Sequence, residues 1–193
     1  MAQAIYHIED ISCCLWQYII SNLAGRWPDK LEFERGMDML EYMRIEAGQG
    51  HEKGRQLLEK MYVEKFGREM PEILTQDRGK PYFADGSAHF SISHTKNHVF
   101  CVLKDHPVGL DAEEMDRKVD LRLAEKILSP TEKERYALAD NKNEALLKLW
   151  VLKEAAAKMT GEGIRGYPNK TDFSPNDPRI QMIDGCYVAV IEK

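Results

Sequence analysis

Cysteine is scarce in this chain, and its few copies are not spaced for a zinc site or a disulfide framework. The 193 residues contain four cysteines, at positions 13, 14, 101 and 186. The adjacent Cys13 and Cys14 are poorly placed to bond to each other, and no two cysteines have the spacing of paired metal ligands. We therefore expect free thiols in a reducing compartment, the cytoplasm.

Long apolar runs, leader signals and repeats are also missing. The longest apolar stretch, around residues 11–20, is too short and too interrupted to cross a bilayer. The opening residues show no basic segment followed by an apolar one, so no secretory signal is expected. No low-complexity segment, short repeat or Gly/Ser/Pro-rich linker divides the chain. The sequence predicts no contact with a membrane.

An excess of positive charge is lacking too. The formal net charge is -5, with 43% hydrophobic and 31% charged residues. This balance is typical of a globular protein with a substantial core, and it argues against nonspecific nucleic-acid binding as the main role. The length fits one large domain or two small ones.

Apolar spacing predicts helices in the first part of the chain and short strands after it. Helical spacing is shown by Phe33, Met37, Leu40 and Met43, and again by Leu57, Leu58, Met61, Tyr62 and Phe66. A turn is expected at 77–81. Three strands are predicted at 89–93, 99–103 and 108–113, and the middle one, an unbroken apolar run, is expected to be buried on both faces.

The second part of the chain predicts two helices and a hairpin. Ser129, Pro130 and Glu132 have the order of an N-cap, an N1 proline and a capping-box acid. A longer helix is expected from about Asn143 to Thr160, ending at Gly161, and a hairpin at 180–191 turns at Asp184-Gly185. The pattern indicates an α+β protein, which we divide into an N-terminal half, 1–105, and a C-terminal half, 106–193.

Three segments combine acids and cations in a way that suits a metal and a polyphosphate. Asp111 and Glu113 alternate on a predicted strand and therefore share one face of it. Glu154 and Lys158 are four residues apart on a predicted helix and share one stripe, with Lys153 beside Glu154. Carboxylate oxygens beside a lysine suit Mg²⁺ shared with a phosphate substrate, so we predict phosphoryl chemistry.

Each feature alone also has a structural interpretation. An Asp-x-Glu pair and a Lys/Glu helix face are common on solvated surfaces. His94 can be a hydrogen-bonded residue at a strand end, Lys80 a turn cation and Trp150 a core residue. A capping box would explain Glu132 fully. The joint order and spacing of the segments favour the functional interpretation.

The same segments carry a family resemblance. Residues 90–95 (FSISHT), 108–113 (VGLDAE) and 150–158 (WVLKEAAAK) resemble the signature of the surfactin-type 4′-phosphopantetheinyl transferases. Arg55-x-Leu57-Leu58, the segment 79–82 and Phe173 extend the resemblance, which runs from about His51 to Phe173. The spacing of Gly-x-Asp-x-Glu from the later Trp-x-x-Lys-Glu-x-x-x-Lys is its most specific element.

The resemblance implies a fold and a reaction. The fold would consist of two similar α/β halves in a pseudo-twofold arrangement, with coenzyme A in the cleft between them. The reaction would be Mg²⁺-dependent transfer of 4′-phosphopantetheine from coenzyme A to a serine of an acyl or peptidyl carrier protein, with release of 3′,5′-ADP. Carriers of fatty-acid, polyketide or nonribosomal-peptide synthesis are all compatible with it.

The resemblance also assigns roles to residues. The metal acids would be Asp111, Glu113 and Glu154, and the catalytic residues Glu154, Lys158 and Glu132, with Glu154 as general base. Coenzyme A would be bound by Arg55, Lys80, Ser93, His94 and Lys158. Glu132 matches an acid near the metal or base, a role that competes with its capping interpretation.

Two other functions remain open at this level. A non-catalytic relative could bind coenzyme A or a carrier protein as a scaffold, although retention of Asp111, Glu113, Glu154 and Lys158 argues against it. A Mg²⁺-dependent phosphohydrolase could use the same acids with water as the nucleophile. Two halves in one chain would complete the cleft without a second copy, so we expect a monomer.

Overall fold

The computed structural model describes residues 39–163 and 171–193. Within them, two three-stranded sheets and one two-stranded ribbon are accompanied by four helices. The mixed α+β class predicted from the sequence is confirmed. The pseudo-twofold relation between two halves and the division at residue 105 stay predictions. In this part of the chain, no helix is both long and apolar enough to cross a membrane.

The first sheet has the strand order β1-β5-β4, with all neighbours antiparallel. Its strands are β1 (Met39–Arg44), β4 (His89–His94) and β5 (His98–Lys104). Every residue of β5 is buried, as expected for an apolar run covered on both faces. The prediction of a helix through Leu40 and Met43 is wrong, because these residues belong to β1. The other two residues of that predicted helix, Phe33 and Met37, lie outside the described residues.

Strand β1 is apolar on both faces, which explains the error. Met39 and Met43 pack into the apolar cluster beneath α2, while Leu40 and Tyr42 pack into a second cluster on the opposite face. Such a strand places apolar residues at spacings that also fit a helix. The expectation that the first half is mostly helical is therefore wrong for residues 39–105, where α2 (Gly50–Phe66) is the helix that the structure describes.

The second sheet has the order β6-β8-β7 and is again antiparallel. Its strands are β6 (Val108–Glu114), β7 (Ile180–Ile183) and β8 (Cys186–Glu192). The predicted hairpin at Asp184-Gly185 is confirmed, with positive φ at both residues. A separate ribbon pairs β2 (Ile73–Thr75) with β3 (Pro81–Phe83), and the predicted turn at 77–81 joins them.

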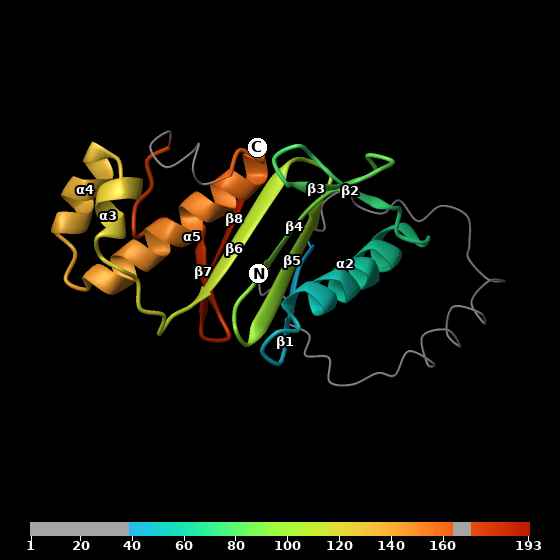
Figure 1. The fold of residues 1–193 in the computed structure, drawn as a ribbon, viewed down its shortest axis with the longest axis horizontal. Coiled ribbons are helices and arrows are strands. Elements are labelled where there is room, and N and C mark those ends of the chain that lie inside the picture. The colour runs from blue at the N-terminus through green and yellow to red at the C-terminus, as the bar shows by residue number, and fades with distance from the viewer. Residues whose placement is uncertain (1–38, 164–170) are drawn as a thin grey trace. The chain divides into compact units, whose positions relative to one another are not determined.

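One long helix covers each sheet (Figure 1). α2 packs on β5 and β4, and α5 (Lys142–Thr160) packs on β6 and β8. The predicted end of α5 at Gly161 is confirmed. The short helices α3 (Leu123–Ile127) and α4 (Pro130–Ala137) join α5 in an apolar cluster, to which the partly buried Trp150 also packs.

The apolar cluster to which Leu40 and Tyr42 belong connects the two sheets. Phe100 and Val102 of β5 meet Leu110 and Ala112 of β6 together with Val188 of β8. The faces of the sheets that carry neither α2 nor α5 are therefore covered by each other's side chains, and β4 and β6, each at the edge of its own sheet, come into contact.

Candidate active site

β6 presents its acids to α5, as its alternation predicts. Leu110 and Ala112 lie in the cluster between the sheets, while Gly109 lies against the backbone of α5. A methyl group on Gly109 would overlap the carbonyl oxygen of Ala155 and the amide nitrogen of Met159. This close approach brings the last turns of α5 onto the strand that carries Asp111.

Lys158 and Asp111 form the centre of the site. Lys158 Nζ lies 2.7 Å from Asp111 Oδ1 and 3.1 Å from Ser93 Oγ. The Ser93 hydroxyl donates to Asp111 Oδ1 at 2.9 Å. Three elements, β4, β6 and α5, thus place a serine, a carboxylate and an ammonium group in mutual contact. Two of the three side chains are buried, and Lys158 is partly exposed.

The hydroxyls of β4 also satisfy the backbone of β6. Ser91 Oγ accepts a hydrogen bond from the amide of Leu110 at 3.0 Å, and Ser93 Oγ accepts one from the amide of Ala112 at 3.2 Å. The Ser-x-Ser spacing places both hydroxyls on the face of β4 toward β6. These side chains take the place of a backbone ladder between two edge strands, a role that sequence reasoning did not assign to Ser91.

One oxygen of Asp111 is left without a partner. Asp111 Oδ2 is buried and accepts no hydrogen bond in the described structure. A buried carboxylate oxygen without a donor is costly unless another group, such as a cation, binds it. The oxygen ligands available here, from Asp111, Glu113 and Glu154, are those that Mg²⁺ prefers. The donor set therefore fits the metal that the resemblance implies.

The three acids do not form a closed metal cage. Among residues 39–163 and 171–193, no group of three His, Cys, Asp or Glu side chains is close enough to hold an ion. Cations of the same chain are bound to two of the acids instead: Lys158 to Asp111, and Arg117 Nη1 to Glu113 Oε1.

Glu154 is half-buried on α5, one turn before Lys158. Burial is the main cause of its raised pKa, and the negative charge of Asp111 raises the pKa further. The positive charges of Lys158 and Arg117 act in the opposite direction. A carboxylate with a raised pKa is a better proton acceptor than an exposed one, so Glu154 has the properties of a general base.

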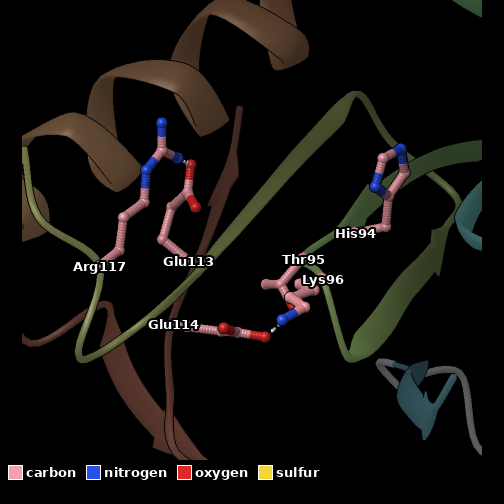
Figure 2. Close-up of a pocket in the computed structure, with 6 residues that line it drawn as sticks. All are labelled: His94, Thr95, Lys96, Glu113, Glu114 and Arg117. Atoms are coloured by element: carbon pink, nitrogen blue, oxygen red, sulfur yellow. Dashed lines mark hydrogen bonds and ion pairs between the residues drawn. The ribbon is translucent and has the colours of Figure 1, made fainter. Parts of the chain in front are cut away.

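A cavity of about 510 Å³ opens beside Glu113 (Figure 2). It lies between the end of β4, the end of β6 and the turn that follows, and it is lined by His94, Thr95, Lys96, Glu113, Glu114 and Arg117. Figure 2 shows Arg117 and Glu113 facing each other, apart from His94. Charges of both signs thus border one open space.

His94 and Arg55 are associated with α2. The His94 ring lies against Gly50, the first residue of this helix, and its centroid is 5.1 Å from that of the His51 ring. A methyl group at Gly50 would overlap the His94 ring, so any larger residue here would displace His94. Arg55 lies on the same helix, exposed to solvent. A helix N-terminus with two histidines and an arginine nearby favours an anion.

Lys80 comes from the turn between β2 and β3 and reaches the end of α5. Its ammonium group donates to the carbonyl oxygen of Met159, and the carbonyl of Val108 lies 3.5 Å away. Burial lowers the pKa of Lys80. Lys80 also lines a second cavity, of about 250 Å³, with Tyr82, Phe90 and Met159 among its walls.

Glu132 and Lys153 lie in a different environment from the other predicted residues. Glu132 completes the predicted capping box, since its Oε2 accepts from the Ser129 amide at 2.9 Å. The same oxygen lies 2.7 Å from Lys153 Nζ, and Oε1 accepts from the Phe173 amide at 2.8 Å. Neither side chain is appreciably exposed. Of the two predicted cations of α5, Lys158 is at the site and Lys153 is bound to Glu132.

Comparison with known proteins identifies relatives over part of the chain. Residues 107–184 match the family model of the 4′-phosphopantetheinyl transferase superfamily. The chain is 34% identical over 116 residues to the 4′-phosphopantetheinyl transferase psf-1 of Bacillus pumilus, covering 58% of this chain and 49% of that protein.

Two further relatives bear the same name. The chain is 28% identical over 138 residues to the 4′-phosphopantetheinyl transferase gsp of Aneurinibacillus migulanus, covering 68% of this chain and 56% of the relative. It is 33% identical over 136 residues to the 4′-phosphopantetheinyl transferase HetI of a Nostoc strain, covering 60% and 57%. The chain therefore spans about half the length of these relatives.

Proposed function

Because the family predicted from the sequence is confirmed as that of the 4′-phosphopantetheinyl transferases, we propose that this protein catalyses the transfer itself. The substrate would be coenzyme A, the acceptor a serine hydroxyl of an acyl or peptidyl carrier protein, and the second product 3′,5′-ADP. We further propose that the protein works in the cytoplasm as a monomer. We expect it to bind neither nucleic acid nor a membrane.

The observation that carries the proposal is the contact of Lys158, Asp111 and Ser93 beside a carboxylate oxygen that has no partner. Each of these residues stands in a segment that the resemblance singles out, and the fold brings the segments together from three elements. A half-buried Glu154 with a raised pKa lies on the same stripe of α5. Such a set suits phosphoryl transfer, where the protein mainly positions groups and neutralises charge.

The residues divide the chemical work as follows. The serine oxygen of the carrier forms a bond to the phosphorus that bears the pantetheine, and the bond from this phosphorus to the bridging oxygen of the pyrophosphate breaks. Glu154 accepts the serine proton. Lys158 turns its ammonium group from Asp111 toward the departing phosphate and neutralises its charge. Mg²⁺, when held by Asp111 with Glu113 and Glu154, would supply further charge neutralisation.

The remaining predicted residues would hold coenzyme A. His94 and Arg55, near the start of α2, offer positive or hydrogen-bonding groups to a phosphate. Lys80 borders the second cavity, between the two-stranded ribbon and the end of α5, where a nucleotide end could lie. Ser93 would act mainly by orienting Asp111, because its hydroxyl already donates to that carboxylate. We assign Glu132 no chemical step, because its oxygens are occupied and buried.

Intact-mass spectrometry tests this proposal directly. A panel of apo fatty-acid, polyketide and peptidyl carriers is incubated with the full chain, Mg²⁺ and coenzyme A. The expected result is a mass gain of one phosphopantetheine on at least one carrier, lost with EDTA and lost in Asp111→Asn. Asp116→Asn, which removes the same charge from the exposed turn after β6, is the matched control and should retain transfer.

Other outcomes identify the alternative functions. Binding of coenzyme A without transfer to any carrier would contradict catalysis and favour a scaffold. Release of 4′-phosphopantetheine and 3′,5′-ADP from coenzyme A without any carrier would indicate a phosphohydrolase.

A further inference from the structure

Arg117 is a residue that neither the motifs nor the resemblance singles out, yet it contacts a predicted metal acid. β6 ends at Glu114, and a turn closed by the bond from the Arg117 amide to the Glu114 carbonyl, 3.0 Å, brings the chain back. This turn places the guanidinium group of Arg117 on the carboxylate of Glu113. Figure 2 shows the two side chains facing each other at the border of the cavity.

The environment of the pair differs for its two members. The side chain of Glu113 is 16% exposed, and that of Arg117 is 48% exposed. The carboxylate is therefore largely fixed in place, while the guanidinium can leave toward solvent without disturbing the core. The positive charge of Arg117 also acts to lower the pKa of Glu154, so it affects two of the three acids.

Asp111, the third acid, is paired with Lys158 of the same chain. Lys158 contacts Asp111 at 2.7 Å, but Asp111 Oδ2 stays without a partner. The described structure thus balances the acids with two cations of its own and leaves one ligand oxygen free. A divalent ion that binds to Glu113 together with this oxygen must compete with the positive charge of Arg117, because like charges repel.

We propose that Arg117 is an internal counter-cation of Glu113, which a divalent metal must displace in order to bind to all three acids. This inference rests on the proposed function, and it adds a residue that sets the metal affinity of the same site. In the metal-free protein, the arginine would reduce the electrostatic repulsion between the acids. The same positive charge would weaken metal binding. Its removal should therefore tighten metal binding, the reverse of what removing a ligand does.

Metal affinity without coenzyme A is the measurement that tests the inference. Mn²⁺ binding to the full chain is followed by electron paramagnetic resonance of the free ion at fixed ionic strength. Arg117→Gln, which retains polarity and much of the length, should bind Mn²⁺ about two- to fivefold more tightly, as expected when a partly exposed ion pair no longer has to be broken.

Two variants serve as controls. Lys118→Gln removes an equal charge from the next, exposed position and should change the affinity by less than about twofold, because exposed charges are screened by solvent and salt. Arg117→Lys retains the charge and should stay close to the wild type. If Arg117→Gln fails to fold in thermal unfolding, Arg117→Met provides the same test.

The outcomes separate this inference from the proposed function. An unchanged or weaker Mn²⁺ affinity in Arg117→Gln, or an equal gain in Lys118→Gln, would overturn the counter-cation role even if the wild type modifies a carrier. Absence of Mn²⁺ binding in every variant would overturn it as well. A gain confined to Arg117→Gln in a chain that modifies no carrier would support the counter-cation and contradict the transferase.

Discussion

Lys153 and Lys158, five residues apart on α5, form ion pairs that differ in their exposure to solvent. Lys153 Nζ lies 2.7 Å from Glu132 Oε2 in a pair from which solvent is excluded, while Lys158 Nζ lies 2.7 Å from Asp111 Oδ1 with a third of its side chain exposed. The first pair joins α5 to the capping box of α4 and to the segment at Phe173. The second is partly open to solvent, so a ligand can compete for the lysine.

Glu132→Gln should destabilise the protein and spare its chemistry. The change leaves the buried ammonium group of Lys153 without its counter-charge, and removing one member of a buried pair costs about 3–5 kcal/mol. Urea unfolding measures the loss, with Glu134→Gln, an exposed position on the same helix, as control. Turnover per folded molecule should stay near that of the wild type. A hundredfold loss in a fully folded variant would instead give Glu132 a catalytic role.

Glu154→Gln should separate binding from turnover. The amide retains the shape of the side chain but accepts no proton, so transfer should slow by about a hundredfold or more if Glu154 is the base. Coenzyme A binding, measured by calorimetry, should change little. Full activity in this variant would remove Glu154 from the mechanism.

Gly109→Ala should destabilise the protein through the backbone of α5. The added methyl group overlaps backbone atoms of Ala155 and Met159, which can move away only if the helix shifts. We expect a loss of about 2–4 kcal/mol in the free energy of unfolding. Gly54→Ala is the matched control, since its methyl group meets only side chains of Ile92 and Val99. A smaller loss at Gly109 than at Gly54 would contradict the close approach of α5.

Asp184→Asn should change how stability depends on pH. The Arg44 guanidinium, with a further contribution from His98, holds the pKa of Asp184 well below its ordinary value of 3.8. A depressed pKa contributes stability that is present above the ordinary value and is lost as pH falls toward the lower one. Asparagine tolerates the positive φ at this turn, so the substitution removes only the charge.

The measurement is urea unfolding over a range of pH. At neutral pH the variant should be less stable by about 1 kcal/mol or less, because the pair is partly exposed. The difference should shrink as pH falls below 3.8. Adding Arg44→Gln to Asp184→Asn should cause little further change in how stability depends on pH below 3.8. A difference that stays constant down to strong acid would contradict the role of the charge.

The local elements of the second part of the chain were predictable because short-range chemistry determines them. The capping box at Ser129, the end of α5 at Gly161 and the hairpin at Asp184-Gly185 are each specified by a few neighbouring residues. The three central strands were predictable from their apolar runs. β1 was not, because partners at residues 98–103, far away in the sequence, make it a strand.

The candidate site was predictable in composition but not in its pairings. The alternation of β6 correctly places Asp111 toward α5 and Leu110 toward the other face. The binding of Lys153 to Glu132, and of Arg117 to Glu113, depends on contacts between elements or on the turn that follows a strand. Arg117 stands four residues after Glu113, a spacing that has no special meaning on a strand, so the sequence offered no signal for it.

The hydroxyl bridges from β4 to β6 restrict how the chain can change in length. Ser91 and Ser93 meet the amides of Leu110 and Ala112 only while both strands keep their alternation. An inserted or deleted residue within either strand would turn the hydroxyls, or the carboxylate of Asp111, to the opposite face. Insertions and deletions should therefore be tolerated in the connections between strands, while the Ser-x-Ser and Asp-x-Glu spacings should be changeable only together.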